Sequence, residues 1–156
     1  MSNDNRDLSF CDNASFDLSR FVTAQSGIYD TALAEIRARR KRTHWMWYIF
    51  PQLRGLGTSY AAVYFAISGF DEAKAYMAHP QLGPRLIECT LAMCDGPETD
   101  AQQILGKIDA AKFRSSMTLF EIAVDQQPCF AIALQKFFNG IRDARTLAAL
   151  NISTKL

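Results

Sequence analysis

The chain has 156 residues, of which 49% are apolar and 21% charged, and this composition excludes an intrinsically disordered protein. It carries 17 Lys and Arg against 16 Asp and Glu, so its net charge of +1 creates no overall field toward nucleic acid or an anionic membrane. The length suits one domain with a hydrophobic core.

The first residues are polar and show little helical periodicity. We therefore expect residues 1–16 to form a mobile tail and residues 17–156 to form a single helical domain. The opening MSNDNRDLSF lacks the basic and then apolar pattern of a secretion signal, and no segment approaches a membrane-spanning run of uncharged apolar residues. These features predict a soluble, cytoplasmic protein with no membrane partner.

Helical periodicity begins directly after this tail. Apolar residues at spacings of three and four predict a helix that starts at Asp17, with Ser15 or Asp17 as its N-cap. A second helix is predicted over 28–40. Residues 44–50 then form a short segment that is apolar on every side, and Pro51 ends it.

The rest of the chain continues the helical pattern. Residues 59–67 favour a helix, although their β-branched and aromatic side chains also allow a short strand. Three polar side chains are candidate caps of later helices, namely Ser68, His79 and Asp109. No internal repeat and no strongly alternating run is present. The pattern predicts an all-α fold, a compact single-domain bundle of about seven to eight short helices.

The cysteines and glycines point to no metal or nucleotide motif. The four cysteines, Cys11, Cys89, Cys94 and Cys129, are too few and too scattered for a disulfide framework, and none has zinc-ligand spacing. We expect reduced thiols. The GLG sequence at 55–57 is neither GxGxxG nor a Walker loop. We therefore expect neither a metal nor a cofactor.

Residues 41–57, KRTHWMWYIFPQLRGLG, combine cations, aromatic rings and glycines, the ingredients of a pocket that stacks a flat ring and holds a phosphate. Trp45 and Trp47 are two positions apart, so on a helix they point about 200° from each other. At most one of them faces a ligand while the other fills the core, and we assign the ligand to Trp47. The polar candidates in this run are Arg42, His44 and Gln52.

Two features of this run have a structural alternative. His44 is either a general base or hydrogen-bond donor, or a structural histidine, which is the commoner role of a lone His. Five cations lie within six residues at the end of the second predicted helix: Arg37, Arg39, Arg40, Lys41 and Arg42. They either complement the helix dipole or bind phosphate, since five cations exceed what a dipole needs.

A second group of polar residues lies in residues 108–120, IDAAKFRSSMTLF. Lys112 and Ser116 are four apart and share a helix face, so that with Ser115 they would form an anion clamp; alternatively, the small serines let helices pack closely. Arg85 is a further anion-binding candidate, or an ion-pair partner of Glu88. A Ser–Lys nucleophilic pair would lack an oxyanion hole and a nucleophile elbow, so we assign no catalytic residue.

Three long blocks, HWMWYIFPQLRGLG, DEAKAYMAHPQLGPRL and KFRSSMTLF, closely resemble the signature blocks of an uncharacterised bacterial family, domain-of-unknown-function family 1810. With FVTAQSGIYDTAL and FFNGIRDARTL, the resemblance covers roughly residues 18–147. It implies a compact all-helical domain and no established activity. The label calpastatin that such chains often carry does not fit, because calpastatins are disordered and repetitive whereas this chain is apolar and unrepeated.

Three functions compete on this sequence. The first is a pocket for a phosphorylated or nucleotide-like small molecule, hence an anionic partner. The second is a protein-interaction or regulatory module without catalysis, and the third is weak binding of nucleic acid, which the near-neutral charge disfavours. The ligand-binding candidates for the first function are Arg42, His44, Trp47, Gln52, Arg85, Lys112, Ser115 and Ser116.

Overall fold

The computed structural model describes residues 16–152, and over them the chain is helical apart from one isolated parallel bridge between Leu53 and Ile67. The expected tail falls almost entirely outside the described residues, as does Ser15. The helices are α2 (Ser19–Gln25), α3 (Tyr29–Arg37), α4 (Met46–Ile49), α5 (Tyr60–Tyr64), α6 (Phe70–Ala78), α7 (Leu82–Cys94), α8 (Gln102–Leu105), α9 (Lys107–Ala123), α10 (Cys129–Phe138) and α11 (Ala144–Ala149).

The all-α prediction is confirmed, but the described residues form ten helices rather than seven or eight. The difference comes from short elements. α4, for example, has four residues, about one turn, and so carries too little periodicity to be recognised from the sequence.

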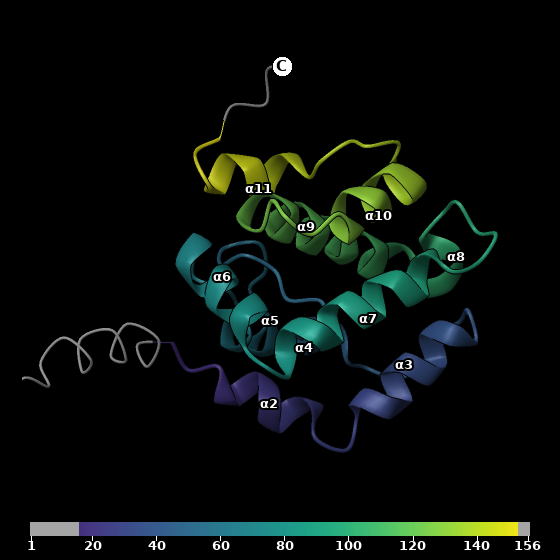
Figure 1. Ribbon diagram of the computed structural model, residues 1–156, viewed down its shortest axis with the longest axis horizontal. Coiled ribbons are helices and arrows are strands. Elements are labelled where there is room, and N and C mark those ends of the chain that lie inside the picture. Colours follow the sequence, from purple (N-terminus) through teal and green to yellow (C-terminus); the bar gives the residue numbers. More distant parts are fainter. Residues whose placement is uncertain (1–15, 153–156) are drawn as a thin grey trace, which may run out of the picture.

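Two helices organise the fold. α9, the longest with 17 residues, packs against α4, α6, α8, α10 and α11, whereas α7 packs against α3, α6 and α10. Figure 1 shows α10 and α11 on one side of α9, and α2 and α3 at the opposite side of the molecule. Segments from both halves of the chain therefore meet along α9.

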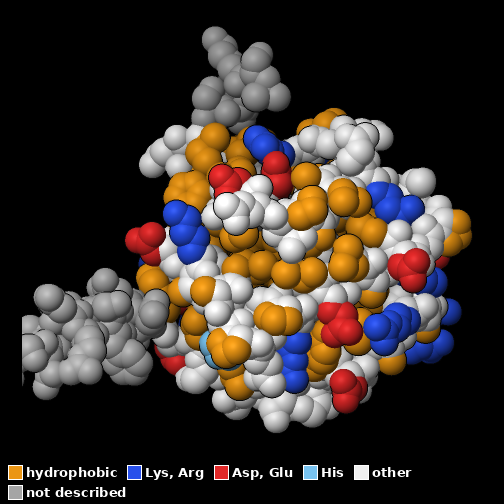
Figure 2. All heavy atoms as spheres, viewed as in Figure 1, with side chains coloured by type: hydrophobic (Ala, Val, Ile, Leu, Met, Phe, Trp, Pro, Cys, Tyr) orange, Lys and Arg blue, Asp and Glu red, His pale blue; other side chains and the backbone are white. Residues whose placement is uncertain are grey.

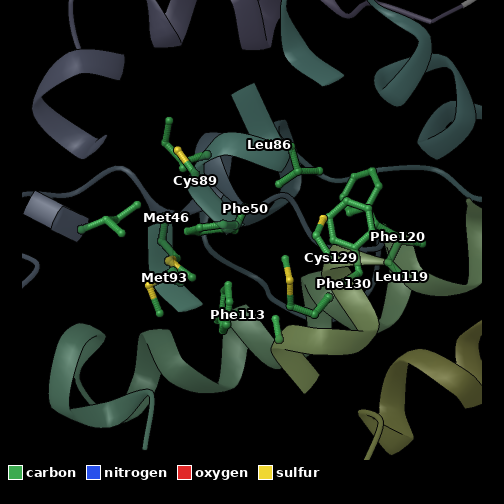
Figure 3. Packing of buried hydrophobic residues seen from close by; sticks show 14 of the residues in the cluster. Met46, Phe50, Leu86, Cys89, Met93, Phe113, Leu119, Phe120, Cys129 and Phe130 are labelled. Atoms are coloured by element: carbon green, nitrogen blue, oxygen red, sulfur yellow. The ribbon is translucent and has the colours of Figure 1, made fainter. Parts of the chain in front are cut away.

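The core is rich in aromatic and sulfur-containing side chains (Figure 3). The ring of Phe50, which follows α4, meets Phe113 of α9 edge to face, with ring centroids 4.9 Å apart. Phe120 and Phe130 pack at 5.8 Å where α9 crosses α10. Fully burying a side chain of this size contributes about 1.5–3 kcal/mol. The first contact holds the end of α4 against α9, and the second holds α9 against α10.

The segment 59–67 combines both interpretations of its sequence. Its first part is helix α5, but the chain then extends, and the N–H of Ile67 donates to the carbonyl oxygen of Gln52 at 2.8 Å. The N–H of Arg54 donates to the carbonyl oxygen of Ile67 at 2.8 Å. The helix prediction is therefore wrong for the last residues, where pairing with the segment after α4 takes over.

Three of the predicted N-caps are wrong. Asp17 precedes α2 by two residues, because the helix begins at Ser19 with Leu18 in the cap position. Ser68 also lies one residue too early, since Gly69 holds the cap position of α6. Asp109 lies in the first turn of α9 rather than at its cap position. That position is held by Gly106, whose backbone φ of 86° is one that favours glycine.

The prediction that His79 is a cap is confirmed at the end of α6, where His79 is the C-cap residue, and its imidazole also contacts the start of α7. Its Nδ1 accepts hydrogen bonds from the N–H groups of Gln81 and Leu82, at 3.1 and 3.2 Å, where α7 begins. The side chain thus satisfies two donors that have no partner within the helix. These hydrogen bonds give His79 a structural role.

Glu35 holds the segment that leads into α4. Its buried carboxylate accepts four hydrogen bonds, from the backbone N–H of Arg42 (2.8 Å), the N–H and hydroxyl of Thr43 (3.0 and 2.8 Å) and the Nε1–H of Trp45 (2.9 Å). Burial by itself raises the pKa of a carboxyl group, but these hydrogen bonds outweigh it and lower the pKa of Glu35 to about 2. The folded structure therefore stabilises the ionised form of Glu35.

We expect Glu35→Gln to lower the free energy of unfolding by about 1–3 kcal/mol at neutral pH, because the amide places donors against donors. The exposed Asp125→Asn is the control and should change little. Denaturant titrations across pH test the cause. Because the folded pKa is depressed from its usual 4.5, the stabilisation is complete above that value and is lost as the pH falls toward about 2. An equal loss of stability at neutral and strongly acidic pH would contradict the role of this charge.

Candidate functional site

A pocket of about 380 Å³ opens where α4, the loop before α5, α9 and α11 meet. We call it the Trp47 pocket. Four predicted site residues line it, Trp47 and Gln52 from the first block and Lys112 and Ser115 from the second. The structure thus brings the two blocks together. The other lining residues are Leu56, Gly57, Thr58, Ser59, Ala62, Ile108, Ala111, Asp143 and Arg145.

The two tryptophans divide as their spacing predicts. The Trp45 side chain is fully buried and its ring faces the core near Phe50, at 6.3 Å between centroids. Trp47 is half-buried and lines the pocket. The Lys112 Nζ lies over the Trp47 ring, 4.5 Å from its centroid, in a cation–π contact. One face of Trp47 is therefore occupied by the lysine.

Asp109 ties this lysine to the basic segment. Its carboxylate lies 2.9 Å from the Lys41 Nζ through one oxygen and 3.4 Å from the Lys112 Nζ through the other. The Lys41 side chain is almost fully buried and also donates to the carbonyl oxygen of Thr43 at 2.6 Å. Lys112 is half-buried and lines the pocket, with Asp109 beside its ammonium group.

A chain of hydrogen bonds forms the opposite, C-terminal side of the pocket. The hydroxyls of Ser115 and Thr146 lie 3.0 Å apart, and the Thr146 hydroxyl donates to Asp143 Oδ2 at 2.6 Å. The same Oδ2 accepts the N–H of Thr146 at 2.9 Å and so caps α11. Arg145 donates to the carbonyl oxygen of Leu56 at 3.2 Å and links α11 to the loop that closes the pocket.

The other four predicted residues lie outside the pocket. Arg42 and His44 are exposed, and Arg42 takes part in the fold through its backbone N–H to Glu35. The Arg85 guanidinium lies 4.5 Å from the centroid of the Tyr29 ring and donates to Gln25, so it belongs to a different part of the molecule. Ser116 is fully buried.

Ser116 is displaced from the predicted clamp by a single position. Its Oγ has no hydrogen-bond partner within the described part of the chain, whereas the neighbouring Ser115 lines the pocket. A one-residue step rotates a side chain by about 100° around a helix. The serine that lines the pocket together with Lys112 is thus at i+3 rather than at i+4.

Much of the basic run has a structural role. The Arg39 guanidinium donates to the carbonyl oxygens of Ala92 and Met93, at 2.6 and 2.7 Å, and pairs with Glu98 at 2.9 Å. It therefore caps the C-terminal end of α7. Arg37 pairs with Glu88 at 3.6 Å, which leaves Arg85 without the ion pair that its spacing suggested. The cluster of cations is not a single phosphate-binding surface.

Asp143 and Arg145 were missed by sequence reasoning. They follow the FFNG segment and precede the last apolar stripe, where an Asp with Thr146 three residues later is typical of a helix N-cap. That pattern predicts the cap but not the proximity to Lys112. Contact between α11 and α9 is what brings these residues to the pocket.

A larger depression of about 790 Å³ lies beside α7 and the end of α3, and it contains none of the predicted residues. Its lining is mainly apolar, with Pro84, Ile87, Leu91 and Ala92, and two of its charged side chains, Arg37 and Glu88, pair with each other at 3.6 Å. Figure 2 shows hydrophobic side chains in the middle of one face of the molecule, with charged side chains around them. We place the candidate site at the Trp47 pocket because polar and aromatic groups converge there.

The cysteines lie away from this pocket. Cys89, Cys94 and Cys129 are free thiols, and burial raises the pKa of Cys89 and of Cys129 to about 12. They are therefore protonated at neutral pH and react slowly.

Over residues 16–152, no group of three His, Cys, Asp or Glu side chains is placed to hold a metal ion. No helix in the same range is long and apolar enough to cross a membrane.

Comparison with known proteins gives a family but no activity. Residues 15–150 match the family described as a protein of unknown function, DUF1810. The fold is similar to the crystal structure of the conserved hypothetical protein Rv1873 from Mycobacterium tuberculosis, with a TM-score of 0.86 and 47% sequence identity. That similarity covers 89% of this chain and 99% of the other. No curated protein matches the chain.

The unequal burial of the tryptophans can be measured by fluorescence. We expect acrylamide to quench the wild-type emission in part, and Trp47→Phe to remove most of the quenchable component, because Trp45 is fully shielded. The conservative change keeps an aromatic ring beside Lys112. An unchanged quenching slope in the variant would show that Trp45 is the accessible tryptophan.

Proposed function

We propose that this chain, which belongs to the DUF1810 family of proteins of unknown function, binds a small phosphorylated or nucleotide-like molecule in the Trp47 pocket. The observation that carries the proposal is the convergence of Trp47 and Gln52 with Lys112 and Ser115 in one concave site. These are the groups that stack a flat ring, contact polar edges and attract an anion. The proposal concerns binding and assigns no reaction.

The charges of the pocket favour an anionic group. Its lining carries two cations, Lys112 and Arg145, against one carboxylate, Asp143. A phosphate that approaches Lys112 meets an ammonium already held in position by Asp109 at 3.4 Å. Holding the cation in place before binding reduces the entropy lost when the ligand binds.

The size of the pocket agrees with a small ligand. A volume of about 380 Å³ lies near the lower end of the range for ligand sites, roughly 300–1,000 Å³. This suits a sugar phosphate or a mononucleotide better than a dinucleotide.

Nucleic-acid binding is not part of the proposal, because Arg39 and Lys41 are engaged in intramolecular ion pairs. The free thiols of the described cysteines support a reducing compartment, the cytoplasm.

Thermal unfolding with a panel of AMP, ribose 5-phosphate and inorganic phosphate tests this function. A ligand at 100 times its Kd stabilises the folded state by about 2.7 kcal/mol. For a domain of this size we expect a rise in Tm of roughly 5–10 °C. Lys112→Met should abolish the rise, since it removes the pocket's ammonium while keeping an unbranched side chain over Trp47.

The matched control is Lys107→Met, an exposed lysine five positions earlier on the same helix and outside the pocket. It changes the net charge equally and should leave the rise in Tm intact. The proposal is wrong if no member of the panel raises Tm. It is equally wrong if Lys112→Met and Lys107→Met respond alike.

A second candidate function, binding of another copy of the protein, has its own support on α5. Tyr60 is 82% exposed and Val63 63% exposed, and Tyr64 stacks on Tyr60 with ring centroids 5.7 Å apart. None of the α5 residues is buried. We call Tyr60, Val63 and Tyr64 the α5 face. Adjacent exposed apolar side chains of this kind mark interaction surfaces.

Sedimentation velocity at several protein concentrations tests this second candidate. If the α5 face is an interface, the wild-type protein associates as its concentration rises, and Tyr60→Ser with Val63→Ser keeps it monomeric. Ile132→Ser, which removes an exposed apolar side chain from α10, is the control and should associate like the wild type. A wild-type protein that stays monomeric at all concentrations would eliminate this candidate.

A further inference from the structure

The hydrogen bonds beside Ser115 have a fixed direction. Thr146 has one hydroxyl hydrogen, and the Asp143 carboxylate at 2.6 Å can only accept it. The Thr146 oxygen is therefore an acceptor toward Ser115, whose hydroxyl lies 3.0 Å away, and Ser115 must be the donor. The Ser115 side chain is only 2% exposed, so it is held in this arrangement.

This direction decides what Ser115 offers to a ligand. Its one hydroxyl hydrogen is used by Thr146, so any hydrogen bond between the Ser115 oxygen and a ligand in the Trp47 pocket must use the oxygen's lone pairs. Asp143 also lines the pocket, and no described residue donates to its second oxygen, Oδ1. Ser115 and Asp143 therefore form an acceptor side of the pocket.

The side of the pocket near Trp47 requires an acceptor from the ligand instead of a donor. Lys112 has only donors and a positive charge, and it lines the same pocket as the two acceptors. A ligand that satisfies both sides carries an anionic group for Lys112 and hydrogen-bond donors for Ser115 and Asp143. An ammonium group is the poorer donor here, because Lys112 and Arg145 both repel it within the pocket.

We propose that the ligand of the Trp47 pocket is a hydroxyl-bearing phosphate ester, with its phosphate at Lys112 and its hydroxyls donating to Ser115 and Asp143. The inference rests on the proposed function and narrows it. Sugar phosphates and ribonucleotides belong to this class, whereas inorganic phosphate and simple alkyl phosphates do not. Site groups left unpaired by a ligand without hydroxyls reduce its affinity.

Isothermal titration with two probes tests the inference. Ribose 5-phosphate carries hydroxyls, whereas propyl phosphate has the same anionic group without them. We expect the wild-type protein to bind ribose 5-phosphate at least about tenfold more tightly, the equivalent of one or two hydrogen bonds. Ser115→Ala and Asp143→Asn should each reduce this preference severalfold. Ser115→Ala should leave the affinity for propyl phosphate unchanged, whereas Asp143→Asn should raise it, because it removes the carboxylate that repels the phosphate.

Two features of the variants keep the test interpretable. Asp143→Asn retains one oxygen to cap α11 and replaces the free acceptor by a donor, so the helix is preserved while the pocket changes. Ser116→Ala is the matched control for Ser115→Ala, because the two serines are adjacent and both buried, but only Ser115 lines the pocket. Ser116→Ala should keep the full preference.

The outcomes separate this inference from the function on which it rests. Equal binding of both probes by the wild-type protein would overturn the acceptor side and leave the phosphate pocket standing. A preference that survives both Ser115→Ala and Asp143→Asn would overturn it as well. If neither probe binds and no member of the thermal panel raises Tm, the proposed function fails and the inference fails with it.

Discussion

The buried Glu35 carboxylate accepts four hydrogen bonds from the segment that leads into α4, and the rest of the site depends on this contact. A buried charge without an adjacent cation is costly unless its oxygens are fully satisfied. Here they are satisfied by a segment that has no regular structure of its own. Once this segment is fixed, Trp45 enters the core and Trp47, two residues later, reaches the pocket.

α9 connects the core to the pocket through its opposite faces. Phe113 and Met117 are fully buried among the aromatic side chains, whereas Lys112 and Ser115 face the Trp47 pocket. The helix that gives the fold much of its hydrophobic stability thus also carries the proposed ligand contacts. A site on a long packed helix is held more rigidly than one on a loop. The loop before α5 and the first turn of α11 complete the pocket around it.

The sequence predicted the parts of the structure that depend on short spacings. Helical class, the opposite directions of Trp45 and Trp47, and the cap at His79 all follow from residues within one or two turns of each other. The one-turn helix α4 was not predicted, because a single turn leaves no period to detect. The extended end of segment 59–67 was missed for another reason, since its hydrogen bonds go to Gln52 and Arg54, distant in sequence.

By itself, the sequence determined the helical class and the different directions of Trp45 and Trp47. Only the tertiary structure decided which polar residues share a site: Ser115 rather than Ser116, Asp143 and Arg145 in addition, and Arg42, His44 and Arg85 elsewhere. The physical reason is the separation in sequence of the residues that interact. Periodicity fixes the direction of a side chain on its own helix, whereas convergence depends on how α4, α9 and α11 pack, and their contacts join residues far apart in the chain.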